Sequence, residues 1–188
     1  MTTGYTIQQQ DQLYFLTFQV VDWVDVFTRP EYRDIILDSF EYAIEHKGFQ
    51  LFAYVIMSNH VHLIAHSSES KLSNTIRDIK KHTSKQIIDT IKNIEESRRE
   101  WMLGLFRKAA TKHTKNKEYQ VWTHENHAIW LYSPNFIAEK IQYIHDNPVK
   151  ALWVQNPEDY LYSSARNYAG LSAFIDVEVL TLPVVTVK

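Results

Sequence analysis

The sequence predicts an α+β fold in which a small antiparallel sheet packs against helices. Short runs rich in β-branched and aromatic residues alternate with longer stretches whose apolar residues recur every three or four positions. The 188 residues are 45% apolar and 22% charged, with 4 Gly and 5 Pro, which is typical of a single globular domain. The sequence contains no cysteine, which excludes a disulfide framework, a thiolate metal site and a cysteine nucleophile.

The first half of the chain predicts a strand, a helix and a β-hairpin. Residues 13–21 are β-branched and aromatic, as in a buried strand. A helix is expected over residues 30–47, because proline stands at its start and glycine follows its end. Two strand-like runs, 49–57 and 60–66, are separated by only two residues, which predicts a tight hairpin.

The second half predicts two further helices and one strand. Isoleucines at helical spacing over residues 71–94 indicate an amphipathic helix. The Lys-rich stretch 95–118 is interpreted as a surface loop or insertion. A short strand is expected within 127–132, followed by a helix over 133–147 that ends where a proline follows.

This element order is that of the ferredoxin-like split βαβ plan. It predicts an antiparallel sheet with its helices on one face and an additional C-terminal helix. We therefore expect one domain over residues 1–188, with its core at about 13–170, an insertion at about 95–118 and a C-terminal tail at 171–188.

Positive charge is concentrated in one part of the chain. The formal net charge is −2, yet residues 71–117 hold 13 Lys and Arg against 5 Asp and Glu. Such a segment is either a solvated helix surface or an electrostatic footprint for a nucleic-acid backbone, and charge alone leaves both open.

His60 and His62 are two residues apart on an expected strand, so both side chains project from the same face. Neutral imidazoles suit divalent transition metals, and this spacing places two ligands without help from a distant segment. The alternative is a pair of surface or hydrogen-bonded histidines.

Tyr143 and Asn147 are four residues apart on the last expected helix and therefore lie on one face of it. The phenol is a candidate nucleophile if a metal or base activates the reaction. Alternatively, Tyr143 is an ordinary half-buried aromatic and Asn147 is a helix C-cap.

Aromatic and basic residues alternate in the segment 157–170. Tyr160, Tyr162, Arg166 and Tyr168 could form a surface that stacks bases and binds phosphate. Packing of these tyrosines against the sheet explains the pattern equally well.

Three segments together resemble a known family. The runs 55–62 (VIMSNHVH), 143–150 (YIHDNPVK) and 160–165 (YLYSSA) resemble the single-tyrosine HUH transposases, most closely their REP-associated, IS200-like tyrosine transposase branch. The resemblance extends over roughly residues 13–170.

The resemblance implies a DNA strand transferase. Tyr143 would be the nucleophile, and His60, His62 and Asn147 would bind Mg²⁺ or Mn²⁺. The substrate would be single-stranded or hairpin DNA, cleaved and rejoined through a 5′-phosphotyrosine intermediate. The residues expected to contact DNA are Arg77, Lys80, Lys81, Lys85 and Arg166.

Two other functions remain open at this stage. One is a metal-dependent nuclease or phosphodiesterase in which water attacks and Tyr143 is structural. The other is a domesticated, non-catalytic nucleic-acid-binding protein. We expect a cytoplasmic monomer or homodimer with no membrane association, since no signal segment or membrane-spanning run is evident.

Overall fold

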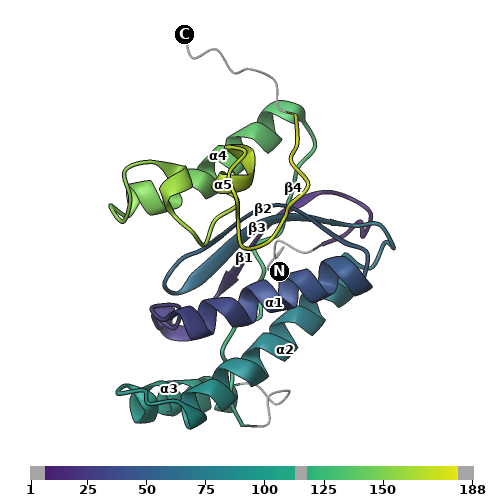
Figure 1. Cartoon of the computed structure of the whole chain (residues 1–188). Helices are drawn as coiled ribbons and strands as arrows, with labels where there is room; N and C mark the ends of the chain where they lie inside the picture. Colours follow the sequence, from purple (N-terminus) through teal and green to yellow (C-terminus); the bar gives the residue numbers. More distant parts are fainter. Residues whose placement is uncertain (1–6, 113–117, 182–188) are drawn as a thin grey trace.

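The computed structural model describes residues 7–112 and 118–181, which form an α+β fold around a four-stranded antiparallel sheet (Figure 1). The strands are β1 (Tyr14–Gln19), β2 (Phe49–Ile56), β3 (His60–Ser67) and β4 (Ile129–Trp130), in the spatial order β2-β3-β1-β4. The helices are α1 (Pro30–His46), α2 (Leu72–Asn93), α3 (Arg99–Thr111), α4 (Pro134–Lys150) and α5 (Ala165–Tyr168), with single 3₁₀ turns η1 (Val21–Trp23) and η2 (Pro157–Asp159). Across the described ranges, none of the helices has the length and apolar character needed to cross a membrane.

The predicted strands and helices occur in the predicted order, with the unpredicted helix α3 between α2 and β4. The expectation that the helices share one face of the sheet holds for α1 and α2 but is wrong for α4. Helices α1 and α2 pack together on one face, whereas α4 lies across the other (Figure 1). The physical reason is visible in β2, where the successive residues Tyr54, Val55 and Ile56 are all buried. Because successive side chains of a strand point to opposite faces, such a strand needs cover on both.

The predicted hairpin is confirmed and sets the position of both histidines. The Met57 amide donates to the His60 carbonyl oxygen at 2.9 Å, which closes the turn between β2 and β3. In the pairing of β3 with β1, His62 lies opposite Thr17 and His60 lies opposite Gln19. The two histidines therefore occupy alternate positions at the start of a strand in the middle of the sheet.

The interpretation of residues 95–118 as a loop is wrong for most of that range, which forms α3. Met102, Phe106 and Ala109 recur at helical spacing and are buried against the rest of the core. Neighbouring charged residues conceal this narrow apolar stripe in the sequence. The Lys-rich run predicted as part of the loop falls largely at residues 113–117, outside the described residues.

Helix α4 also differs from its expected end. It begins as predicted, because the Ser133 hydroxyl accepts a hydrogen bond from the Phe136 amide at 3.3 Å. It does not stop at Asn147 but continues to Lys150 with Pro148 inside its last turn. Pro148 removes a single amide donor near the helix end, and the Ala151 amide still donates to the Asn147 carbonyl oxygen at 2.9 Å.

The inner face of α4 is fastened to β2 by a buried hydrogen-bond relay. His145 Nε2 lies 2.9 Å from Ser164 Oγ, which accepts a hydrogen bond from the Tyr54 amide at 2.9 Å. Burial lowers the pKa of His145 from its ordinary value near 6.5 to about 4. This imidazole is therefore neutral in the folded protein down to mildly acidic pH.

We expect the protein to lose stability as the pH falls from 7 to 4, partly through His145. The unfolded chain binds a proton at His145 below about pH 6.5, whereas the folded chain resists it down to about pH 4. Replacing His145 with Gln should reduce this loss of stability by about 3 kcal/mol at pH 4. Urea unfolding of both proteins at several pH values checks the prediction, and parallel curves would contradict it.

Candidate active site

His60 and His62 form a pair on the sheet face that α4 covers. Their ring centroids are 4.6 Å apart, and the rings meet edge to face. His62 is only 7% exposed, and its Nδ1 lies 2.8 Å from the Thr17 hydroxyl oxygen on the neighbouring strand. The contact between the two imidazole rings confirms the prediction that both histidines share one face of the sheet.

Burial keeps both imidazoles neutral. It lowers the pKa of His60, and it lowers the pKa of His62 to about 3, with smaller contributions from His60 and His127. Neutral imidazole carries one nitrogen lone pair, which is the form that binds a metal ion. His127 lies close enough to affect His62, although nothing in its sequence position, before a short edge strand, indicates this.

Tyr143 on α4 contacts His62 of the pair. Its ring centroid is 5.3 Å from that of His62 and 5.9 Å from that of Phe15, both in edge-to-face geometry. Phe15 also stacks on His62, with the centroids 5.3 Å apart. Tyr143 nevertheless remains 40% exposed. The aromatic contacts hold the ring in place while leaving the residue open to solvent.

Two lysines on the same helix flank the tyrosine, and neither is among the site residues that the sequence predicts. Lys140 Nζ and Lys150 Nζ lie 5.7 Å and 5.6 Å from the centroid of the Tyr143 ring. Lys140 stands three residues before Tyr143, and Lys150 stands seven residues after it. This spacing places both lysines on the same face of α4 as Tyr143. Lys140 Nζ also lies 3.0 Å from Glu139 Oε1, and Lys150 Nζ lies 3.8 Å from Asp146 Oδ2, so each ammonium group is shared between the Tyr143 ring and a carboxylate.

Asn147 lies one turn beyond Tyr143, and its amide nitrogen donates to the Tyr143 carbonyl oxygen at 2.8 Å. Its side-chain oxygen is therefore the atom that could serve as a ligand. Within residues 7–112 and 118–181, no cluster of three or more His, Cys, Asp and Glu side chains could hold a metal ion. Imidazole nitrogens suit divalent transition metals and a carboxamide oxygen suits Mg²⁺ and Mn²⁺, so the chemistry of these three side chains is compatible with a divalent cation.

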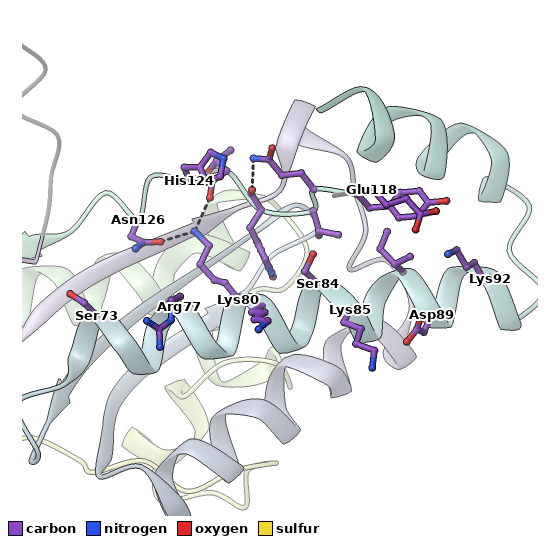
Figure 2. A pocket seen from close by; sticks show the side chains of 17 residues that line it. Ser73, Arg77, Lys80, Ser84, Lys85, Asp89, Lys92, Glu118, His124 and Asn126 are labelled. Atoms are coloured by element: carbon purple, nitrogen blue, oxygen red, sulfur yellow. Dashed lines mark hydrogen bonds between the residues drawn. The ribbon is translucent and has the colours of Figure 1, made fainter. Parts of the chain in front are cut away.

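The basic residues of α2 line a groove of about 670 Å³ between this helix and the segment 118–126 (Figure 2). Arg77, Lys81 and Lys85 are exposed along it. Tyr119 lies at the same groove, with Lys92 Nζ at 4.7 Å from its ring centroid. The groove therefore combines positive charge with aromatic surface.

Lys80 differs from its neighbours because its ammonium group points into the protein. It donates to the Thr123 carbonyl oxygen and to Asn126 Oδ1, both at 2.7 Å (Figure 2), and lies 5.5 Å from the Phe18 ring centroid. Burial lowers the pKa of Lys80 to about 8. Lys80 thus fastens α2 to the opposite wall of the groove.

Arg166 lies on α5, apart from the lining of this groove. Its guanidinium group donates to the carbonyl oxygens of Ser172 and Glu158, at 2.6 and 3.0 Å. The structure thus gives Arg166 two internal partners. Tyr160 and Tyr162 are buried, in agreement with the packing alternative for these two tyrosines.

The chain is similar to two solved structures. One is a REP-associated tyrosine transposase bound to a REP hairpin, with a TM-score of 0.62 and 17% identity over 100% of both chains. The other is a candidate transposase from Deinococcus radiodurans R1, with a TM-score of 0.45 and 16% identity over 78% of this chain and 97% of that one. None of the curated proteins matches. The family model described as "Transposase IS200 like" matches residues 13–124, more than half of the sequence, and the chain therefore belongs to the IS200-like transposase family.

Proposed function

We propose that this protein is a metal-dependent tyrosine transposase that cleaves and rejoins single-stranded, hairpin-flanked DNA through a 5′-phosphotyrosine intermediate. The observation that carries the proposal is the contact of Tyr143, partly exposed on α4, with the buried His62 of the pair on β3. The strand order β2-β3-β1-β4 supports a ferredoxin-like core as its scaffold.

Hairpin DNA is the substrate that the comparisons favour. The solved REP-associated tyrosine transposase was bound to a REP hairpin, and its fold extends over the whole of this chain. The match to the family model ends at residue 124, so the roles of Tyr143 and Asn147 rest on their geometry and on the resemblance of residues 143–150 to the family.

The proposed cleavage step is an in-line displacement at phosphorus. Tyr143 Oη forms a bond to the scissile phosphorus, and the bond from phosphorus to the 3′ oxygen breaks. The phenol proton passes to solvent, and the departing 3′ oxygen takes up a proton. Rejoining is the reverse step with a different 3′-hydroxyl, so the phosphodiester energy is conserved and no ATP is required.

A divalent cation held by His60, His62 and Asn147 would polarise the scissile phosphate and stabilise the charge that develops on it. The protein contributes positioning. Phe15 and His62 hold the Tyr143 ring, while Lys140 and Lys150 favour the approach of a phosphate to it.

We propose that the groove of Figure 2 binds the DNA backbone. Segment 118–126, which forms one wall of the groove, is hydrogen-bonded to β1, the strand next to the one that carries His60 and His62. The Thr17 amide donates to the Asn126 carbonyl oxygen at 2.8 Å, and the Thr123 amide donates to the Gln19 carbonyl oxygen at 2.9 Å. DNA in the groove would therefore lie against a segment that is tied to the active-site strand.

Exchanging lysines of α2 should separate DNA binding from stability. Changing Lys81 and Lys85 together to Ala should weaken hairpin binding and reduce the salt slope of the binding constant by about 1 to 2, because exposed lysines release counterions at phosphates. The melting temperature should change by no more than about 1 °C. Binding titrations at several salt concentrations and thermal melts measure both effects.

Lys80→Ala serves as the matched variant. It should lower the stability by about 2 kcal/mol, or roughly 5 °C in melting temperature, because two acceptors lose their donor. If Lys80→Ala melts like the wild type, or if the Lys81 and Lys85 variant keeps the full salt slope, this division of roles is wrong.

Labelled single-stranded hairpin DNA, drawn from repeats that flank the protein's own gene, tests the function. The protein and DNA are incubated with Mn²⁺ or Mg²⁺ and separated on a denaturing gel. A metal-dependent band of protein-linked DNA supports the transferase. Cleavage without a linked product identifies a nuclease, and binding without cleavage identifies a non-catalytic binder; either result overturns the proposal.

A further inference from the structure

We propose that Asn59 and Asp25 are positioning residues that fix the tautomer of His60, so that its Nδ1 carries the proton and its Nε2 keeps the lone pair. The inference rests on the proposed function only where it names His60 as a metal ligand. The tautomer itself is a property of the free protein.

The contacts form a short relay from a carboxylate to the imidazole. The Asn59 amide nitrogen donates to Asp25 Oδ1 at 2.9 Å, with the Trp23 carbonyl oxygen 3.5 Å away on the same side. The Asn59 side-chain oxygen lies 2.8 Å from His60 Nδ1. Asn59, in the middle of the relay, is therefore bonded on both sides.

Hydrogen-bond chemistry gives this relay one direction. A carboxylate and a carbonyl oxygen can only accept, so the side of Asn59 that faces Asp25 and Trp23 must be its NH₂ group. The side-chain oxygen must then face His60. Since that oxygen can only accept, His60 Nδ1 has to donate, and in a neutral imidazole the lone pair then resides on Nε2.

His62 lacks such a constraint. Its Nδ1 lies 2.8 Å from the Thr17 hydroxyl, which can either donate or accept, so this bond is compatible with both tautomers. Asn59 therefore determines which nitrogen of His60 is protonated, whereas Thr17 does not determine this for His62. A partner that orients a ligating imidazole typically changes metal affinity by about 10- to 100-fold when it is removed.

The backbone around the relay is held independently of these side chains. The Val20 amide donates to the Asn59 carbonyl oxygen at 2.9 Å, and the Phe27 amide donates to the Ser58 carbonyl oxygen at 2.8 Å. The Arg98 guanidinium donates to the Asp25 carbonyl oxygen at 2.8 Å. Side-chain variants at Asn59 and Asp25 should therefore fold and keep the turn.

Nitrogen-15 NMR of the imidazoles in the full chain, without metal or DNA, reads the tautomer directly. We expect His60 in the wild type to be protonated at Nδ1, and Asn59→Ala to shift it toward protonation at Nε2. Asp25→Asn should retain the wild-type pattern, because its amide oxygen can still accept, whereas Asp25→Ala should weaken it. His66, whose ring nitrogens lie near Gln50 Oε1 and the Asp11 carbonyl oxygen, is an internal control whose spectrum should not change.

Calorimetric titration with Mn²⁺ alone supplies the second measurement. Affinity should fall about 10- to 100-fold in Asn59→Ala and stay within a few-fold of wild type in Asp25→Asn. A wild-type His60 protonated at Nε2, or an Asn59→Ala variant with unchanged spectra and affinity, overturns the inference. If the wild type binds no Mn²⁺, the proposed metal site fails, while the NMR result still decides the tautomer.

Discussion

Replacing Tyr143 with Phe is expected to reduce DNA cleavage by about 1,000-fold or more and to eliminate the protein-linked product. The substitution deletes the attacking oxygen and nothing else, and loss of a nucleophile typically costs this much or more. The phenyl ring can keep its edge-to-face contacts with Phe15 and His62. Single-turnover cleavage of labelled hairpin DNA measures the effect, and hairpin affinity and melting temperature should stay at wild-type values.

Tyr42→Phe is the matched control for this experiment. Tyr42 is also an exposed tyrosine beside a histidine, with its ring centroid 4.6 Å from that of His46, but it lies on α1 at the opposite face of the sheet. The Tyr42→Phe variant should cleave hairpin DNA at the wild-type rate. Cleavage by Tyr143→Phe at a rate similar to that of Tyr42→Phe would show that Tyr143 is not the nucleophile.

Replacing His60 with Ala should lower metal-dependent cleavage by more than about 100-fold while hairpin binding changes by no more than a few-fold. His60 would supply a neutral metal-ligating nitrogen, whereas the groove that we propose for DNA lies along α2. Cleavage rates over a range of Mn²⁺ concentrations, with binding measured in parallel, separate the two effects.

His66→Ala is the control on the same strand and the same face. His66 Nδ1 lies 2.6 Å from Gln50 Oε1 and its Nε2 lies 3.0 Å from the Asp11 carbonyl oxygen, away from the pair formed by His60 and His62. It should retain full cleavage. Equal losses in the His60 and His66 variants would indicate a general effect of removing a histidine from β3 and not a role in binding metal.

Much of the fold follows from local patterns in the sequence. The hairpin that carries His60 and His62 is evident from two strand-like runs with a two-residue gap, and the amphipathic α2 is evident from its isoleucines. Helix α3 was missed because its apolar stripe is narrow and lies among charges. Pro148 indicated an early helix end, but tertiary packing of α4 tolerates one missing donor in the last turn.

The sequence predicts those features of the candidate site in which the period of a strand or helix determines where side chains point. A spacing of two on a strand predicts that His60 and His62 share a face, and a spacing of four predicts the same for Tyr143 and Asn147. That these two faces meet depends on how α4 crosses the sheet, which no local pattern encodes. The sequence equally could not show that Lys80 is turned inward while Lys81 remains exposed.

Peptide mapping of the protein-linked product identifies the residue that attacks the DNA. After reaction with hairpin DNA and Mn²⁺, the protein is digested with nuclease and protease, and the modified peptide is located by mass spectrometry. If Tyr143 is the nucleophile, the peptide that contains it carries a nucleotide joined through its 5′ phosphate to the phenol oxygen. A nucleotide attached to any other residue, or joined through a 3′ phosphate, would contradict this role of Tyr143.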